Sequence, residues 1–177
     1  MSPEQKALAL GITFPKKDKG YLNLCVRSGN QLLTSGHVSD MKGKLGANLT
    51  TEQGYQAAKE CAIKILQSVH ETHGTLDGLR VVRLLGCVNS TGDFIEQHLV
   101  INGASDLMVE VFGERGRHAR SAVGMGSLPR GIPVEIEIVV EVNAAPARAS
   151  RAAAVRKSAA KAERPSPKQK SAKAKRR

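Results

Sequence analysis

The chain has 177 residues, a length that suits one ordinary domain, and a formal net charge of +11. The whole excess lies at one end: residues 1–142 carry 15 basic and 15 acidic side chains, whereas residues 143–177 carry 12 Lys or Arg and one Glu. Attraction to acidic partners is therefore expected of the tail alone. The wide spacing of the three cysteines excludes a disulfide framework, and the lack of a long apolar run excludes a membrane span.

The first half of the chain contains signals for a hairpin and a helix. Residues 21–27 and 31–35 are two short extended runs around a Ser-Gly-Asn turn, which predicts a β-hairpin. A Gly- and Lys-rich loop follows at 40–50. The apolar stripe of residues 51–73 has helical spacing, begins with a Thr-x-x-Gln capping box and ends at Gly74, so it predicts a helix.

The second half alternates strand and helix signals. Residues 79–89 are rich in β-branched side chains and predict an interior strand. A second helical region is expected to start near Asp93 and to end at Gly113, and a short strand is expected at 119–124. Residues 133–142 alternate with period two, which places three glutamates on one strand face, away from the core.

These elements predict an α+β fold with two helices on one face of a sheet, occupying residues 1–142. Residues 143–177 change abruptly to Ala, Lys, Arg, Ser and Pro, and we expect this segment to be a disordered basic tail. Such a tail favours non-specific contacts with nucleic-acid phosphates, with a merely solubilising extension as the alternative. Three separated cysteines and the absence of a signal core indicate a cytoplasmic protein.

Known cofactor motifs do not account for the chain. His70 and His73 have a spacing that could hold a metal ion, but a solvated last helical turn is the favoured interpretation. No dinucleotide fingerprint, phosphate-binding loop or serine or cysteine nucleophile motif occurs. The sequence therefore predicts neither a metal nor a cofactor.

Arg117 and Arg120 precede a short strand, which is followed by the acidic strand at 133–142. Arg120 starts an apolar run, so we expect it at a strand edge, where a guanidinium could bind a carboxylate with two parallel hydrogen bonds. An internal salt bridge from Arg120 to Glu135 or Glu137 is the alternative, and residue chemistry alone favours it.

Several segments resemble the Rid family, also called YjgF or L-PSP, of reactive-intermediate imine deaminases. They are Arg-Ser-Gly-Asn-Gln-Leu-Leu-Thr-Ser-Gly-His at 27–37, Val-Asn with Asp-Phe at 88–94, Ala-Arg-Ser-Ala-Val at 119–123, and Leu-Pro followed by Val-Glu-Ile-Glu at 128–137. The resemblance covers roughly residues 7–142.

The resemblance implies a chorismate-mutase-like mixed sheet and a homotrimer with ligand clefts between subunits. It implies that Arg120 binds the substrate carboxylate, that Glu135 orients the attacking water, and that Tyr21 and Gly36 lie at the ligand site. The implied reaction is hydrolysis of enamines or imines of the 2-aminoacrylate type to 2-keto acids and ammonia, without a metal or cofactor.

Two positions depart from the family pattern. Ala122 stands where active members commonly have a cysteine, and His118 stands where a proline is usual. The alternative function is a non-catalytic Rid-fold binder of small ligands that is attached to nucleic acid by the tail. An L-PSP-type endoribonuclease is less favoured, since no His/Lys pair can be placed as its acid and base.

Overall fold

The computed structural model describes residues 1–16 and 20–142, so the predictions for the tail at 143–177 lie outside the described residues. The helices and strands, in chain order, are α1 (Pro3–Ala9), β1 (Cys25–Ser28), β2 (Gln31–Thr34), β3 (His37–Val38), α2 (Thr51–His73), β4 (Leu79–Asn89), α3 (Gln97–Phe112), η1 (Gly113–Gly116), β5 (Ala119–Met125), η2 (Pro129–Gly131) and β6 (Val134–Val142).

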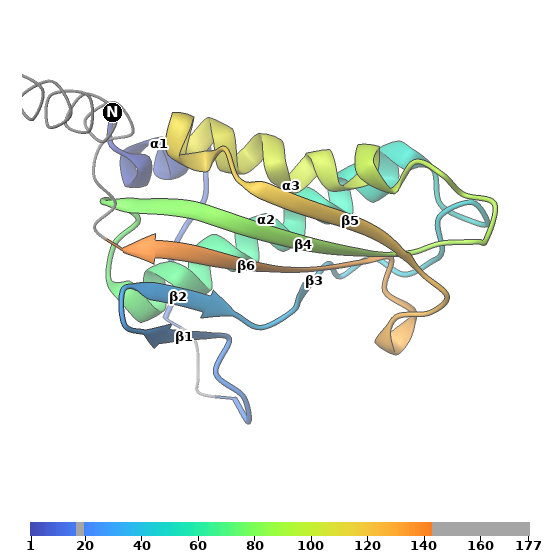
Figure 1. The fold of residues 1–177 in the computed structure, drawn as a ribbon, viewed down its shortest axis with the longest axis horizontal. Helices are drawn as coiled ribbons and strands as arrows, with labels where there is room; N and C mark the ends of the chain where they lie inside the picture. The colour runs from blue at the N-terminus through green and yellow to red at the C-terminus, as the bar shows by residue number, and fades with distance from the viewer. Residues whose placement is uncertain (17–19, 143–177) are drawn as a thin grey trace, which may run out of the picture. The chain divides into compact units, whose positions relative to one another are not determined.

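In this part of the chain the strands form one sheet in the order β1-β2-β6-β4-β5, and β3 extends the pairing on β6. β4 and β5 run parallel, whereas the other neighbours are antiparallel. The long helices α2 and α3 cover one face of the sheet (Figure 1). The predicted α+β fold with two helices on one face is therefore confirmed, and β5 is an edge strand.

The helix α2 begins and ends where its sequence signals predict. The Thr50 side chain accepts from the backbone N–H of Gln53, and the Gln53 side chain accepts from that of Thr50, which satisfies two otherwise unpaired donors. Gly74 ends the helix in the left-handed region, at φ 89°. α2 packs closely on α3 at Gly103, where an added Cβ would lie 2.9 Å from the Tyr55 carbonyl carbon.

The strand β6 separates the two faces of the sheet. Its buried residues, Val134, Ile136, Ile138, Val140 and Val142, join the core that α2 and α3 cover. The intervening glutamates are half-buried or exposed, so the predicted alternation is confirmed. The opposite face carries no helix in the described residues and is called the open face below.

Three local features differ from the sequence prediction. α1 was not expected, although Ser2 caps it with a complete capping box and Pro3 occupies its first turn. The two-residue strand β3 was also missed. α3 begins at Gln97 rather than near Asp93, because Leu45 bonds the backbone of Asn89 and Thr91 and holds the segment after β4 extended.

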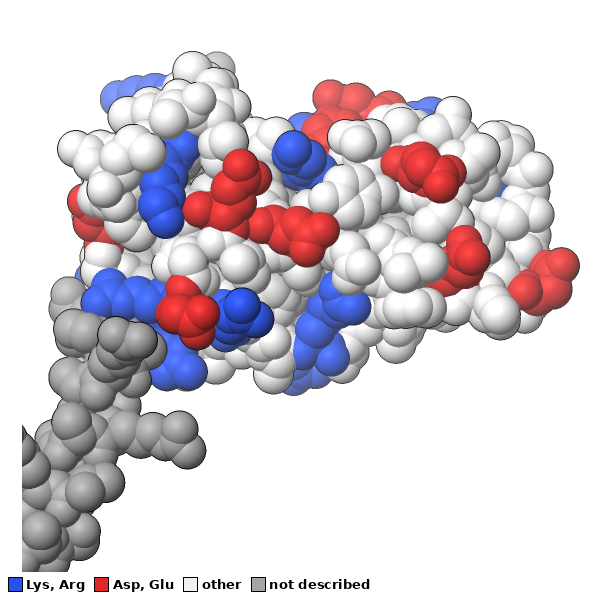
Figure 2. All heavy atoms as spheres, turned by 90° about the horizontal axis from the view of Figure 1, so that it is seen from above, with Lys and Arg blue, Asp and Glu red and all other residues white. Residues whose placement is uncertain are grey.

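Acidic and basic side chains are interspersed on the face seen in Figure 2, with no large area of one sign. This distribution matches the charge balance of residues 1–142. No helix within the described ranges is long and apolar enough to cross a membrane.

Candidate functional site

The edge strand β5 directs Arg120 toward α3. Arg120 pairs in register with Leu84, which is fully buried beneath the helices. Its Nη1 donates to Asn102 Oδ1 at 2.9 Å and to Ser105 Oγ at 3.0 Å, and its Nη2 donates to the His98 carbonyl at 3.3 Å. These three partners lie at spacings of four and three residues on one face of α3, so one helix face holds the guanidinium.

The Arg120 guanidinium is held entirely by neutral acceptors. None of the ion pairs among the described residues includes Arg120, so the alternative salt bridge to Glu135 or Glu137 does not form in this chain. The side chain is exposed, and three of its five N–H donors are used, which leaves Nε–H and one Nη2–H. The guanidinium is thus held in one orientation, and its positive charge is available to an anion.

His118 extends this cluster through Ser105. His118 Nδ1 lies 2.6 Å from the Gly116 carbonyl, which can only accept, so Nδ1 carries the proton. In the neutral ring, Nε2 is then bare and accepts from Ser105 Oγ at 3.1 Å. The hydroxyl donates to His118 and accepts from Arg120, so the direction of each hydrogen bond in the cluster is fixed.

The surroundings of His118 favour its neutral form. Burial lowers its pKa most, the positive charge of Arg120 lowers it further, and the hydrogen bond to Gly116 opposes both effects. The ring therefore titrates below the ordinary histidine value. Within the described chain, Arg120 is the charged side chain that contributes to this pKa.

Sequence reasoning missed Asn102, Ser105 and His118. A usable signal for His118 was its place two residues before Arg120, because side chains at that spacing share a side of an extended chain. Asn102 and Ser105 lie three residues apart on a helix that also carries four other polar or charged side chains. Neither pattern indicates by itself that the two elements meet.

Glu135 lies on the open face, beside the turn before β3. It pairs in register with Val38 on one side and with Cys87 on the other. Gly36 packs against its carboxylate so closely that an added Cβ would lie 2.7 Å from Glu135 Cδ and closer still to Oε1. The structure thus brings together two of the residues singled out in the sequence, Glu135 and Gly36.

The thiol beside this carboxylate is kept protonated. Burial raises the pKa of Cys87, and the negative charges of Glu135 and Glu137 raise it further. Cys87 is therefore unsuited to act as a thiolate nucleophile.

Arg120 and Glu135 point to opposite faces of the sheet within one protomer. The row Ala122, Gly86 and Ile136 faces the helices, since a Cβ on Gly86 would meet Ile101 of α3. Glu135 is the neighbour of Ile136 and faces the other way. One protomer therefore carries two separate half-sites: the guanidinium with α3, and the carboxylate with Gly36.

Tyr21 stands apart from both half-sites in the described contacts. Its side chain is fully exposed in the segment before β1, next to Leu22, which is 66% exposed. Val26, Leu33 and Val123 are also exposed on the sheet. Val26 and Leu33 lie opposite each other in the β1–β2 pair, whereas Val123 lies on the other edge strand; adjacent exposed apolar side chains of this kind are typical of a surface that another protein covers.

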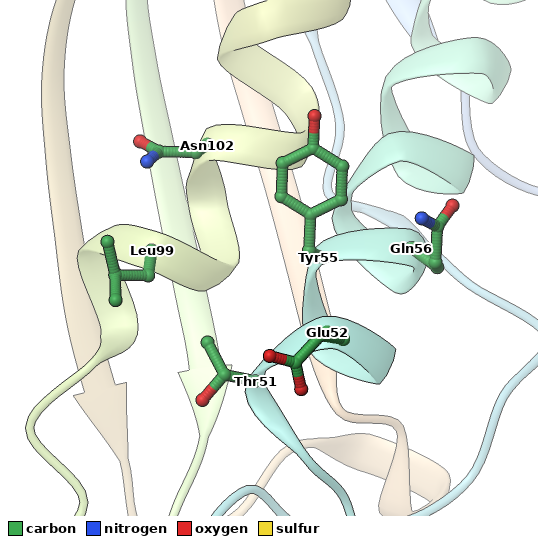
Figure 3. A pocket seen from close by; sticks show the side chains of 6 residues that line it. All are labelled: Thr51, Glu52, Tyr55, Gln56, Leu99 and Asn102. Carbon is green, nitrogen blue, oxygen red and sulfur yellow. The ribbon is translucent and has the colours of Figure 1, made fainter.

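A shallow pocket of about 320 Å³ lies between α2 and α3 (Figure 3). Its lining residues are Thr51, Glu52, Tyr55, Gln56, Leu99 and Asn102. The Asn102 side chain points away from Tyr55, consistent with its hydrogen bond to Arg120. The Glu52 carboxylate makes this pocket a poor place for an anion, so the exposed edge of Arg120 is the better candidate.

The histidines weighed as metal ligands lie in the last turn of α2. His70 stacks on Phe14 with ring centroids 4.1 Å apart and lies 3.6 Å from the Glu4 carboxylate. The described residues contain no group of three or more ligating side chains around His70 and His73 or elsewhere.

Comparison with known proteins identifies the family of the chain. Residues 4–134 match the family model described as "YjgF/chorismate mutase-like, putative endoribonuclease". Protein TCP17 of Trypanosoma cruzi is 44% identical over 144 residues, which are 76% of this chain and 90% of the relative.

Two solved structures are also similar. The protein Atu1372 of Agrobacterium tumefaciens, described as of unknown function, has 40% identity and a TM-score of 0.71, over 80% of this chain and 92% of that one. A Shewanella oneidensis protein described as a "putative endoribonuclease" has 28% identity and a TM-score of 0.74, over 80% of this chain and 100% of that one.

Proposed function

Since the chain belongs to the YjgF/chorismate mutase-like family, we propose that it hydrolyses reactive enamine or imine acids of the 2-aminoacrylate type to 2-keto acids and ammonia. The observation that carries this proposal is the state of Arg120. It is an exposed cation that neutral acceptors hold in place and that no carboxylate of the described chain neutralises.

The two N–H donors left on Arg120 suit a substrate carboxylate. Hydrogen bonds between a guanidinium and a carboxylate are charge-assisted and contribute about 1.5–3 kcal/mol each when a ligand shields them from water. Because α3 already fixes the guanidinium, little side-chain entropy is lost when an anion binds. Arg120 thus supplies both affinity and orientation.

The second half-site would come from a neighbouring copy of the chain. Arg120 and Glu135 cannot meet on one ligand within a protomer, because they face opposite sides of the sheet. In a homotrimer, a cleft between subunits would bring Arg120 of one copy near Glu135 and Gly36 of the next. Burial of the exposed Tyr21 and its aliphatic neighbours would favour such an assembly.

The chemistry needs few groups. A protonated imine carbon is already electrophilic, so positioning a water molecule next to it supplies much of the acceleration. Glu135 would hold that water by accepting its hydrogen bond, while Arg120 holds the carboxylate on the same substrate. Addition of water and loss of ammonia leave the 2-keto acid.

The test is keto-acid release from 2-aminoacrylate generated in situ, compared with the spontaneous reaction. Wild-type protein should accelerate the release, and Arg120→Ala should lower kcat/KM by about 100-fold or more. Arg117→Ala is the matched control, because Arg117 is exposed and paired with Glu114, and it should retain wild-type rates. Wild-type release at the spontaneous rate would refute the proposal.

Ribonuclease activity is the rival enzymatic function, because the family description and the Shewanella relative both carry that name. The same preparations, incubated with a labelled RNA, distinguish the two. RNA cleavage that survives in Arg120→Ala, without keto-acid release in the wild type, would favour the rival.

The basic segment 143–177 carries a separate proposal, which rests on its 12 cations and single acid. Non-specific DNA or RNA binding by the full chain should weaken steeply as salt rises, since binding releases counterions. Fluorescence anisotropy of a labelled duplex at low and moderate salt measures this. Binding that does not depend on salt would contradict it. If the full chain binds nucleic acid but keto-acid release stays at the spontaneous rate, the non-catalytic binder is the better hypothesis.

A further inference from the structure

The contacts of Ser105 define a short path for a proton beside Arg120. A serine hydroxyl has one proton to donate and two lone pairs to accept with. Its proton is given to His118 Nε2, and one lone pair is taken by Arg120. The other lone pair is left for a water molecule or a substrate group.

His118 can receive that proton without moving. Its Nδ1–H is anchored on the Gly116 carbonyl at 2.6 Å, which fixes the ring and aims the bare Nε2 at Ser105 Oγ, 3.1 Å away. A hydroxyl within reach of a base that a third group orients is the arrangement used for general base catalysis. Here a backbone carbonyl serves as the orienting group.

This proton path lies on the same side of the sheet as the Arg120 guanidinium. Arg120 Nη1 donates to Ser105 Oγ at 3.0 Å, so Ser105 and a substrate carboxylate on the free N–H groups of Nε and Nη2 would be bound by the same guanidinium. Glu135 of the same protomer faces the opposite side of the sheet. Among the side chains that hydrogen-bond in the Arg120 cluster of the described chain, His118 is the one with a basic nitrogen, because His98 contributes its backbone carbonyl.

We propose that Ser105 and His118 form a proton relay for the hydrolysis, which rests on the proposed function. Ser105 Oγ takes a proton from the attacking water as its own proton passes to His118 Nε2. The water oxygen bonds to the carbon of the protonated imine, and the C=N π pair moves to nitrogen. This gives a neutral carbinolamine and an imidazolium.

The relay then runs in reverse. The imidazolium returns its proton through Ser105 to the amino group, and the C–N bond breaks with its electron pair leaving on ammonia. The hydroxyl proton of the carbinolamine goes to that ammonia, so the products are the 2-keto acid and ammonium. His118 and Ser105 regain their starting states.

The charges around His118 support its use as a base in the loaded site. Arg120 on β5 is the charged side chain that lowers its pKa, η1 contributes the Gly116 carbonyl, and α3 contributes the neutral hydroxyl of Ser105. A carboxylate bound to Arg120 offsets the positive charge. Substrate binding should therefore raise the basicity of His118 at the moment when a base is needed.

The test compares Ser105→Ala and His118→Gln with wild type in the keto-acid assay from pH 5 to 8. Both variants should lose about 100-fold or more in kcat with KM changed less than about threefold. In wild type, kcat should fall as pH drops through the His118 pKa, and this acidic limb should be absent from His118→Gln. Ser105→Thr keeps a hydroxyl and should restore most of the rate, and His73→Gln is the matched histidine control.

The outcomes separate this inference from the function on which it rests. Wild-type release at the spontaneous rate overturns both. If wild type is active and His118→Gln has the same kcat and the same acidic limb as wild type, the relay alone is overturned. A raised KM with unchanged kcat also overturns it, because the pair would then only position Arg120.

A readout without turnover completes the test. Nitrogen NMR of the histidine rings should show His118 protonated at Nδ1 with a bare Nε2, and saturation with pyruvate should raise its pKa. Pyruvate that binds without moving this pKa would contradict the proposed coupling.

Discussion

Replacing Gly36 with Ala should displace the Glu135 carboxylate while leaving the backbone intact. The added Cβ would lie 2.7 Å from Glu135 Cδ and closer still to Oε1, whereas ordinary contacts begin near 3.4 Å, so the carboxyl group must retreat by about 1 Å or more. Gly36 does not have a positive φ, so alanine fits its backbone. The flexible Glu135 side chain can absorb the clash at about 0.5–1.5 kcal/mol of rotamer strain.

The catalytic effect should exceed the effect on stability. A misplacement of about 1 Å can cost about 100-fold in rate, so kcat in the keto-acid assay should fall between about 10-fold and 100-fold. Urea unfolding should show a loss of only about 1 kcal/mol. Gly92→Ala is the control, because its added Cβ meets nothing within 4 Å. Wild-type kcat in Gly36→Ala, with kcat strongly reduced in Glu135→Gln, would show that Gly36 does not set the position of the carboxylate.

Three further experiments test the cap of α2, the burial of Cys61 and the pKa of His118. Thr50→Ala removes the side-chain cap of α2 and should lower the free energy of unfolding by about 1 kcal/mol in urea titrations; an unchanged midpoint would argue against the capping box. Burial raises the pKa of Cys61 to about 12, so a disulfide reagent at pH 8 should label this thiol only after unfolding, and fast labelling of folded protein would contradict its burial. Folding lowers the pKa of His118, so its contribution to stability is present above the pKa of the unfolded state and is lost as pH falls through the pKa of the folded state. The free energy of unfolding of wild type should therefore decline more than that of His118→Gln between pH 7 and 5. Parallel plots of this free energy against pH would count against the prediction.

Much of the fold could be predicted because local signals and tertiary packing agree. α2 has a capping box, a glycine end and one apolar face, and its observed bounds match the expected 51–73. β4 matches the expected 79–89, and β6 differs from its expected range by one residue. In each case the residues that favour the element are also the residues that form the core.

Two of the three missed features depend on partners distant in sequence, whereas α1 has its own local capping box. The strand β3 has only two residues and exists because β6 pairs with it. The delayed start of α3 follows from bonds between Leu45 and the backbone of Asn89 and Thr91, which no local pattern encodes. Propensity alone cannot report such long-range hydrogen bonds.

In the candidate site, too, some features could be predicted from the sequence and others depend on contacts between distant residues. The resemblance singled out Arg120 and Glu135, but strand register decides which face each one occupies, and register follows from pairing across the sheet. Ser105 and His118 are 13 positions apart, and only the packing of α3 against β5 brings them within hydrogen-bonding distance. In the sequence, His118 was visible only as a departure from the family pattern.

The proposed function depends on Arg120 binding an anion while neutral acceptors hold its guanidinium in place. A crystal structure of the protein soaked with pyruvate tests it most directly. The pyruvate carboxylate should bind Nε and Nη2 of Arg120, with Asn102 and Ser105 still hydrogen-bonded to Nη1. An acidic side chain paired with Arg120, or pyruvate bound only elsewhere, would contradict it.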